Sequence, residues 1–163
     1  MKLSLKVLAM LSAVALLAAC SNASKNGADN GGSGMDGAGG AGTGSGYLDA
    51  NHSVSDRVFF GYDSSVIDSD GQDTLQKQAD YLKKNTGINV TVEGHCDERG
   101  TREYNLALGE RRATAAKNYL VSLGVSSSRI QTISYGKERP AVVGDDESAW
   151  SQNRRAVTVK SVQ

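Results

Sequence analysis

The sequence has few of the residues that usually carry enzyme chemistry or bind metals. It contains only two cysteines and two histidines in 163 residues. Glu93, His95 and Asp97 alternate along one predicted strand face, but no second cluster of histidine or cysteine completes a zinc site. His95 and Cys96 are neighbours in that strand and point to opposite faces, so they cannot form a nucleophile–base pair. No G-x-S-x-G motif is present. We therefore expect a binding protein without metal or cofactor rather than an enzyme.

The chain also lacks an excess of charge of either sign. Eighteen lysine and arginine residues balance 18 aspartate and glutamate residues, and three of each sign precede residue 51. The remaining part of the chain is therefore balanced as well. Domains that bind nucleic acid normally carry a basic patch or stripe. We expect no nucleic acid partner.

The one long apolar run lies at the N-terminus. Lys2 and Lys6 precede the apolar run 7–17, which is too short for a membrane-spanning helix and has the pattern of a secretory signal. The next residues, Leu-Ala-Ala-Cys, resemble the lipobox at which bacterial lipoproteins are cleaved. This resemblance implies that residues 1–19 are a signal peptide and that Cys20 becomes the lipidated N-terminus.

The residue after Cys20 indicates in which membrane a lipoprotein of this kind would be anchored. Ser21 stands there instead of aspartate, which by the rule for bacterial lipoproteins implies the outer membrane, with the chain facing the periplasm. Lipoprotein N-termini carry several acyl chains, and two or more chains anchor a protein stably. The alternative is an ordinary signal peptide, in which Cys20 has no special role. If Cys20 is lipidated, Cys96 has no partner for an internal disulfide, and we expect it to be a small buried residue.

Residues 20–50 differ in composition from the rest. Ten of the 19 glycines fall in this stretch, together with Ser, Asn, Ala and Asp and almost no large apolar side chains. Such a segment buries too little surface to offset its chain entropy, so we expect a flexible tether. A tether lets a membrane-anchored domain work at a distance, although a spacer without function would have the same composition.

Residues 51–163 have the length of one ordinary domain, and strand and helix patterns alternate along them. Helix-spaced apolar residues, capping residues and alternating strand patterns place the elements. The predicted strands are 57–62, 88–95, 129–135 and 156–162, and the predicted helices are 70–85, 101–123 and 146–154. The order βαβαβαβ predicts an α/β (α+β) domain with a single mixed sheet and helices packed against it.

The stretch 92–113 joins the second strand to the long helix and holds the most informative pair of charges. Asp97 stands where the strand ends, and Thr101 is placed to cap the helix after a turn that ends at Gly100. Arg112 lies on the small and apolar stripe of the helix. A buried cation is costly unless it is paired. Arg112 therefore requires either a neighbouring carboxylate or a ligand.

The sequence of this stretch, E-G-H-C-D-E-R-G-T-R-E-Y-N-L-A-L-G-E-R-R-A, resembles the signature of the OmpA-like peptidoglycan-binding domain. The segments S-Y-G-K-E-R-P-A and S-Q-N-R-R-A-V are similar to outer-membrane lipoproteins of that family. The resemblance implies non-covalent binding of the peptide stem of peptidoglycan, with diaminopimelate as the recognised residue. It also implies TolB and other Tol-system proteins as partners, and a role in keeping the outer membrane attached to the wall during cell division.

The resemblance places the family's key pair on Asp97 and Arg112. Diaminopimelate presents an ammonium and a carboxylate on one carbon, so Asp97 would accept from the ammonium and Arg112 would hold the carboxylate by two hydrogen bonds. By the same resemblance, further contacts fall on Tyr62, Asp63, His95 and Leu108. Tyr62 and Leu108 would form apolar walls. The alternative is that Asp97 and Arg112 bond each other and only tie the turn to the helix.

Other residues of the motifs have more than one possible role or lie outside the expected binding site. Glu98 and Arg99 in the turn either brace the loop or contact ligand at the rim. The segment 153–155, Asn-Arg-Arg, is expected to hold the final strand against the helices. Cys96 occupies a position where relatives often carry Ala or Thr, so a thiol that is open to oxidation would be particular to this chain. Whether TolB and the ligand share a surface stays open at this point.

Overall fold

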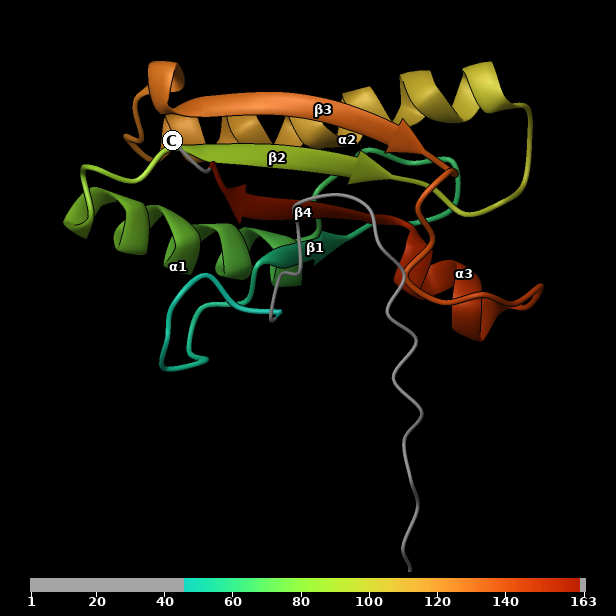
Figure 1. The fold of residues 1–163 in the computed structure, drawn as a ribbon, viewed down its shortest axis with the longest axis horizontal. Coiled ribbons are helices and arrows are strands. Elements are labelled where there is room, and N and C mark those ends of the chain that lie inside the picture. Colours follow the sequence, from blue (N-terminus) through green and yellow to red (C-terminus); the bar gives the residue numbers. More distant parts are fainter. Residues whose placement is uncertain (1–45, 162–163) are drawn as a thin grey trace, which may run out of the picture. The chain divides into compact units, whose positions relative to one another are not determined.

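The computed structural model describes residues 46–161 (Figure 1). The predicted signal peptide, the lipidation site Cys20 and most of the predicted tether lie outside the described residues. Residues 46–50, which the sequence assigned to the tether, include the buried Leu48. The backbone N–H of Leu48 donates to the carbonyl of Val54, so this short segment folds onto the residues that precede the first strand.

The secondary structure confirms the predicted order βαβαβαβ. Its elements are β1 (Arg57–Phe59), α1 (Ser69–Lys84), β2 (Val90–His95), α2 (Arg102–Ser122), a 3-10 turn (Ser127–Arg129), β3 (Ile130–Gly136), α3 (Glu147–Asn153) and β4 (Arg155–Lys160). Thr101 caps α2 as expected, because its Oγ1 accepts from the backbone N–H of Tyr104 at 3.2 Å.

The first strand is shorter than its apolar pattern predicted. It ends at Phe59 instead of Tyr62, since the chain turns at Gly61–Ser64, where the N–H of Ser64 faces the carbonyl of Gly61 at 3.4 Å. Asp63 has a positive φ of 48° in this turn. The turn brings Tyr62 and Asp63 out of the sheet and toward the end of β2.

The four strands form one mixed sheet in the order β1-β4-β2-β3 (Figure 1). β2 pairs with β3 in parallel, and β4 lies antiparallel to both β1 and β2. The last strand is thus inserted between the first and the second. This insertion brings the residues before β4, including Arg154, beside the chain that leaves β1.

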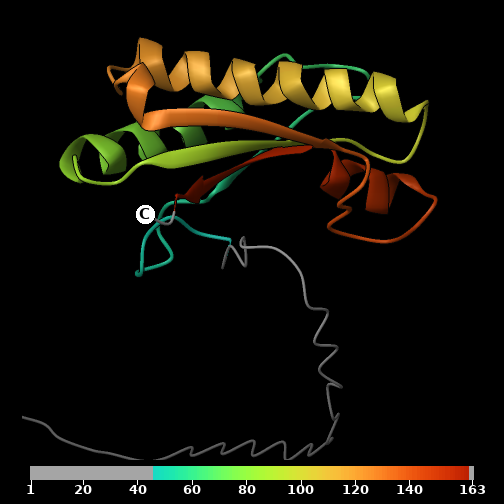
Figure 2. The same ribbon diagram turned by 45° about the horizontal axis from the view of Figure 1, so that its top comes forward.

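The hydrophobic core lies between one face of the sheet and the helices α1 and α2 (Figure 2). α1 contributes Leu75, Ala79 and Leu82, whereas α2 contributes smaller residues such as Ala113 and Ala116. The strands, together with Phe60 just after β1, add a third group of apolar side chains: Val58, Phe60, Val90, Val92, Ile130 and Ala156. This arrangement is the single-sheet α+β fold that the sequence predicted.

Two glycines allow α2 to lie very close to β2. A Cβ on Gly94 would lie 1.8 Å from the carbonyl oxygen of Gly109, and a Cβ on Gly109 would lie 2.2 Å from Oγ of Ser134. Because real Cβ atoms do not approach backbone atoms so closely, position 94 requires glycine, and a Cβ at position 109 would displace the Ser134 hydroxyl. The close contact fixes the height of α2 above the sheet, and with it the positions of Leu108 and Arg112.

The short helix α3 lies at the end of the sheet where β2 ends (Figure 2). Asp146 caps it, since its Oδ1 accepts from the N–H of Ala149 at 3.0 Å. Within residues 46–161, no helix combines the length and the apolarity that a membrane crossing would need.

Candidate functional site

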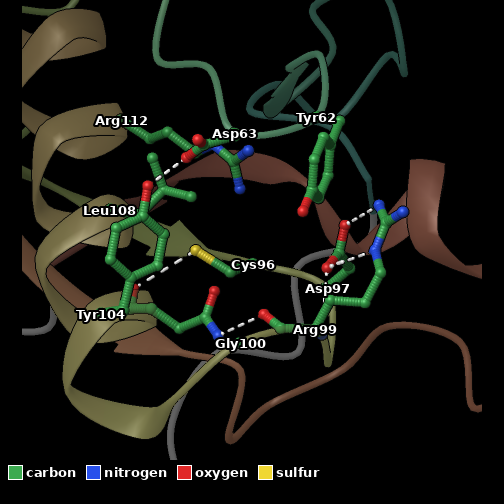
Figure 3. Close-up of a pocket in the computed structure, with 10 residues that line it drawn as sticks. Tyr62, Asp63, Cys96, Asp97, Arg99, Gly100, Tyr104, Leu108 and Arg112 are labelled. Carbon is green, nitrogen blue, oxygen red and sulfur yellow. Dashed lines mark hydrogen bonds and ion pairs between the residues drawn. The ribbon is translucent and has the colours of Figure 1, made fainter.

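A pocket of about 410 Å³ opens beside the end of β2 (Figure 3). This volume is in the range of small-ligand sites. The pocket walls come from the turn after β1, the loop after β2 and the first three turns of α2. They comprise Tyr62, Asp63, Cys96, Asp97, Arg99, Gly100, Tyr104, Asn105, Leu108 and Arg112. Five of the six predicted peptidoglycan-binding residues thus line one pocket.

Arg112 is the most buried charged group in this site, with only 1% of its surface exposed. Its guanidinium donates from Nε to the carbonyl of Ser64 at 2.8 Å, from Nη1 to that of His95 at 2.8 Å, and from Nη2 to that of Gly61 at 3.1 Å. Among the described residues, no carboxylate pairs with it. Burial lowers the pKa of Arg112 from its usual value, but an arginine of this kind stays charged. Arg112 is therefore a buried cation that hydrogen-bonds to neutral carbonyl groups and lies over the ring of Phe60, with its guanidinium carbon 5.3 Å from the ring centroid.

Two N–H donors of Arg112 remain after these three bonds. A guanidinium carries five N–H groups, and the bonds above use one on Nε and one on each terminal nitrogen. The other two belong to the terminal nitrogens, one on each. That pair can hold a carboxylate by two parallel hydrogen bonds. The same residue can thus brace the turn after β1 and bind an anion.

Asp97 lies on the opposite side of the pocket and pairs with a different arginine (Figure 3). Its carboxylate accepts from the Arg99 side chain at 2.6 and 3.1 Å and from the Arg99 backbone N–H at 3.1 Å. Nη1 of Arg154 lies 3.5 Å from the same carboxylate. The direct Asp97–Arg112 bond, which the sequence left open as an alternative, does not form. Asp97 and Arg112 instead face one pocket from two sides.

The local charges keep Asp97 ionised. Burial by itself would raise the pKa of this carboxyl, but the hydrogen bonds from the Arg99 side chain and backbone outweigh burial, and the pKa lies below its usual value. Asp97 is 5% exposed. A buried carboxylate that is ionised at neutral pH can accept hydrogen bonds from a ligand ammonium.

Arg99 is held between two aromatic rings at the rim of the pocket. Its guanidinium carbon lies 4.2 Å from the ring centroid of Tyr62 and 4.0 Å from that of Trp150. Such stacking stabilises a cation on an aromatic face. Nε1 of Trp150 also donates to Glu98 at 3.2 Å. Arg99 therefore both braces the loop and contributes to the pocket wall, so the two roles that the sequence offered for it are compatible.

The remaining pocket wall is mixed in character. Tyr104 Oη donates to Asp63 across the pocket mouth, and this bond joins α2 to the turn after β1. Leu108 is buried and contributes an apolar surface one helical turn before Arg112. Cys96 is 2% exposed, as expected for a small buried residue, and its Sγ donates to the carbonyl of Asn105. Burial raises the pKa of the Cys96 thiol, so it stays protonated at neutral pH.

His95 is the one predicted binding residue that is not part of the pocket wall. Its backbone carbonyl accepts from Arg112, but its ring packs against Tyr135, with ring centroids 5.5 Å apart. The nearest carboxylate, on Glu93, lies 3.7 Å from Nε2, which is too long for a hydrogen bond. Burial lowers the pKa of His95, so the ring is neutral at neutral pH. His95 therefore contributes to the site through its backbone carbonyl, which accepts from Arg112, and not through its ring.

Sequence reasoning did not assign Arg154 to the site. Its guanidinium lies behind Asp97, and it also donates from Nε to the carbonyl of Phe60 at 2.9 Å and to the carboxylate of Glu147. The bond to Phe60 ties this segment to the chain that leaves β1, and the bond to Glu147 ties it to α3. The contact with Asp97 depends on the insertion of β4 beside β1, and no local pattern in the sequence indicates that insertion.

The strip Glu93, His95 and Asp97 does not assemble as a metal site. Asp97 pairs with arginines, as described above, and the sheet register shifts between Gly94 and His95. Within residues 46–161, no group of three or more histidine, cysteine or carboxylate side chains has a metal-binding arrangement. The pocket wall thus combines one ionised carboxylate, Asp97, with the guanidinium groups of Arg99 and Arg112.

Comparisons with known proteins agree with this fold. Residues 59–155 match the OmpA family. The chain is 56% identical over 153 residues to the peptidoglycan-associated lipoprotein of Mesorhizobium japonicum, covering 93% of this chain and 90% of that protein. It is 55% identical over 153 residues to the protein of the same name from Agrobacterium fabrum, covering 94% of this chain and 85% of that protein.

Solved structures show the same fold. The crystal structure of the peptidoglycan-associated lipoprotein from Burkholderia pseudomallei matches with a TM-score of 0.63 and 44% identity, covering 64% of this chain and 89% of that one. The C-terminal domain of Helicobacter pylori MotB, at 21% identity and a TM-score of 0.60, covers 65% of this chain and 83% of that one and shares the fold alone. None of these relatives is named as an enzyme. The chain belongs to the OmpA family and, within it, to the peptidoglycan-associated lipoproteins.

Proposed function

We propose that the pocket binds peptidoglycan through the peptide stem, at the free end of diaminopimelate. The observation that carries this proposal is Arg112, a buried cation that hydrogen-bonds to neutral carbonyls and faces the same pocket as an ionised carboxylate. The relatives named above are peptidoglycan-associated proteins, which agrees with such a ligand. In this proposal Arg112 holds the ligand carboxylate, and Asp97 accepts from the ammonium on the same carbon.

Binding of the ammonium requires an exchange at Asp97. The Asp97 carboxylate bonds to Arg99 at 2.6 Å, and the ligand ammonium replaces part of that contact. Arg99 keeps its stacking on Trp150 and Tyr62, so it stays at the rim and can contact the ligand carboxylate. Leu108 and Tyr62 enclose the aliphatic part of the ligand. The buried charges make the site specific for a zwitterion, because a ligand that lacks either charge leaves one protein group unpaired.

The test is binding of the full-length chain, in detergent, to a purified muropeptide that contains diaminopimelate. Isothermal titration would compare it with a lysine-type muropeptide, which lacks the second carboxylate. We expect binding to the first ligand only, and a loss of at least about tenfold in affinity for Asp97→Asn. Asp80→Asn is the matched control, since Asp80 pairs with Lys83 on the exposed side of α1. Equal binding of both muropeptides, or unchanged binding by Asp97→Asn, would contradict the proposal.

The proposed cellular role follows from the predicted architecture. Residues 1–19 would direct export, the lipid on Cys20 would hold the chain on the periplasmic side of the outer membrane, and residues 20–50 would let the domain 51–163 reach the wall. The chain would thus link the outer membrane to peptidoglycan, as part of the Tol system, during cell constriction.

TolB is the proposed protein partner, and it would compete for the face that carries the pocket. In the loop after β1, Tyr62 is 66% exposed and Val66 is 76% exposed. Exposed apolar side chains beside a pocket are suited to protein contact. If both partners use this face, a saturating muropeptide lowers the affinity for TolB by linkage. Unchanged TolB affinity in the presence of the muropeptide would show two separate surfaces.

A further inference from the structure

β3 forms the longer open edge of the sheet. On one side it pairs with β2, and among residues 46–161 no strand pairs with its other side (Figure 1). The opposite edge differs, since β1 has three residues and an additional bridge between Tyr47 and Ser55 lies next to it in the chain. An edge strand of seven residues presents a row of backbone donors and acceptors to any chain that lies beside it.

The edge has one feature that limits such pairing, a register shift at Tyr135 near its C-terminal end, but it lacks most of the others. Proteins protect long edges with lysine, proline, inward-pointing charges or a covering loop. The central residues of β3, Gln-Thr-Ile-Ser-Tyr at 131–135, contain no charge and no proline. Ile133 is 39% exposed at the middle of this edge. The strand therefore has the composition of one that pairs rather than one that avoids pairing.

A groove of about 530 Å³ runs along this edge between β3 and α2. Leu106 and Ile133 are its large apolar residues, and Leu106 is 46% exposed. The carboxylates Glu103 and Glu110 also line it. No lysine or arginine is part of its wall. The groove is thus apolar with acidic margins.

We infer that β3 and this groove form a docking edge for an extended segment of another protein, which adds to the sheet as a fifth strand. The partner segment alternates lysine or arginine residues, whose side chains face α2 and pair with Glu103 and Glu110, with apolar residues, whose side chains lie on the opposite face of the sheet against Ile133. Backbone hydrogen bonds to β3 supply affinity, and the alternating side chains supply specificity. The charge of the groove selects a basic partner.

The same charges disfavour a second copy of this chain. Oγ1 of Thr132, near the centre of β3, donates to Glu110 at 2.9 Å, so this carboxylate lies at the middle of the edge. Two copies that pair about the centre of β3 would bring both Glu110 carboxylates together. Like charges across such a contact cost free energy. A basic segment of a different protein fits this edge better.

The docking edge is separate from the pocket that binds the proposed ligand. Leu106 and Glu110 line the groove, whereas Leu108 and Arg112 line the pocket. Positions two residues apart point in nearly opposite directions on a helix. α2 therefore presents one side to the pocket and the other to the groove, and both partners can bind at the same time.

The test uses the full-length chain in detergent and a synthetic peptide of about nine residues, long enough to cover β3, in which valine alternates with lysine. A second peptide has glutamate in place of lysine. Backbone amide chemical shifts and hydrogen exchange of β3 report the site of binding. We expect the lysine peptide to shift and protect β3 amides and to bind at least about tenfold more tightly than the glutamate peptide.

Two variants that add the same charge at different places distinguish binding at β3 from binding elsewhere on the surface. Ile133→Lys blocks the edge, and we expect it to weaken binding of the lysine peptide by at least about tenfold. Val143→Lys is the control at a side chain that is 92% exposed in another loop, and it should bind as the parent chain does. Leu106→Ser tests the groove wall without adding charge. Circular dichroism and thermal unfolding check that each variant is folded.

Three results would overturn this inference. The first is equal binding of the two peptides. The second is a set of peptide-induced shifts that omits β3. The third is a dimer of the chain alone, seen by analytical ultracentrifugation and dissociated by Ile133→Lys, because a second copy would then occupy the edge. Muropeptide titration of Ile133→Lys is done in parallel, so a failure of the proposed ligand is distinguished from a failure of the docking edge.

Discussion

At the scale of single residues, the two functions of Arg112 are difficult to separate. The guanidinium supports the turn after β1 through the carbonyls of Gly61 and Ser64, and the same group faces the pocket. A loss of binding in an Arg112 variant therefore requires a control that measures the structural part alone. Arg129 provides it, because this guanidinium also bonds to the three carbonyls of Leu82, Asn85 and Ile88 but is not part of the pocket wall.

Arg112→Lys keeps the positive charge but loses the planar group of donors. We expect muropeptide affinity to fall at least about tenfold and the free energy of unfolding to fall by about 1–3 kcal/mol, because buried carbonyls lose their partners. Arg129→Lys should show a similar loss of stability with unchanged muropeptide affinity. Urea unfolding and isothermal titration measure both quantities. Normal binding by Arg112→Lys would show that this guanidinium does not contact the ligand.

Asp97 predicts a defined dependence of stability on pH. Its pKa is lowered in the folded chain, so the charged carboxylate stabilises the fold above the unfolded pKa of about 3.9, and this contribution is lost as the pH falls through the lower folded pKa. We expect the difference in unfolding free energy between the parent chain and Asp97→Asn to be constant from about pH 8 to 5. It should shrink below about pH 4. A difference that persists unchanged in strong acid would contradict the ionised state of Asp97.

At the scale of the elements, the close packing of α2 on β2 positions the pocket. β2 leads into Asp97, and α2 carries Leu108 and Arg112. The distance between these two elements is set where Gly94 meets Gly109. Protein interiors transmit such a change because they are close-packed, so a side chain at this contact moves both walls of the pocket.

Gly94→Ala should therefore destabilise the fold by about 3 kcal/mol through overpacking and weaken muropeptide binding as well. Gly87→Ala is the control, because a Cβ there meets no atom within 4 Å, and we expect a change of less than about 0.5 kcal/mol. Thermal and urea unfolding of both variants measure the difference. Equal stability of the two variants would mean that α2 can move away from the sheet at little cost.

At the scale of the whole molecule, anchoring and ligand binding are assigned to separate segments. The proposed lipid is on Cys20, whereas the pocket is built from residues 62–112. A substitution in one segment should therefore remove its function and leave the function of the other segment intact.

Cys20→Ser should move the chain from the membrane fraction to the soluble fraction, because the acyl chains supply stable membrane binding. Its muropeptide affinity should stay within about twofold of the parent chain, since the proposed tether would add no contact to the ligand. Cell fractionation and isothermal titration measure the two effects. A Cys20→Ser chain that stays in the membrane fraction would show that another feature anchors it.

Much of the architecture can be predicted from the sequence by itself, because it is written in local patterns. The alternating residues of β2, the capping Thr101 and the helical spacing of Leu75, Ala79 and Leu82 each report their own neighbourhood, and the structure confirms these elements. The burial of Arg112 could also be predicted, because its position on the helix stripe follows from helical periodicity. The predicted C-terminal end of the first strand was wrong. The turn at Gly61 that follows the strand depends on hydrogen bonds from Arg112, which belongs to another element.

Only the tertiary structure decided how the charges pair. The sequence left open a direct bond between Asp97 and Arg112, whereas the fold pairs Asp97 with Arg99 and Arg154 and gives Arg112 three carbonyl groups. The physical reason is the strand order. Insertion of β4 between β1 and β2 brings Arg154 to Asp97, and the turn after β1 brings its carbonyls to Arg112. Such long-range placement has no signature in the local spacing of residues, yet it sets which groups in the pocket remain available to a ligand.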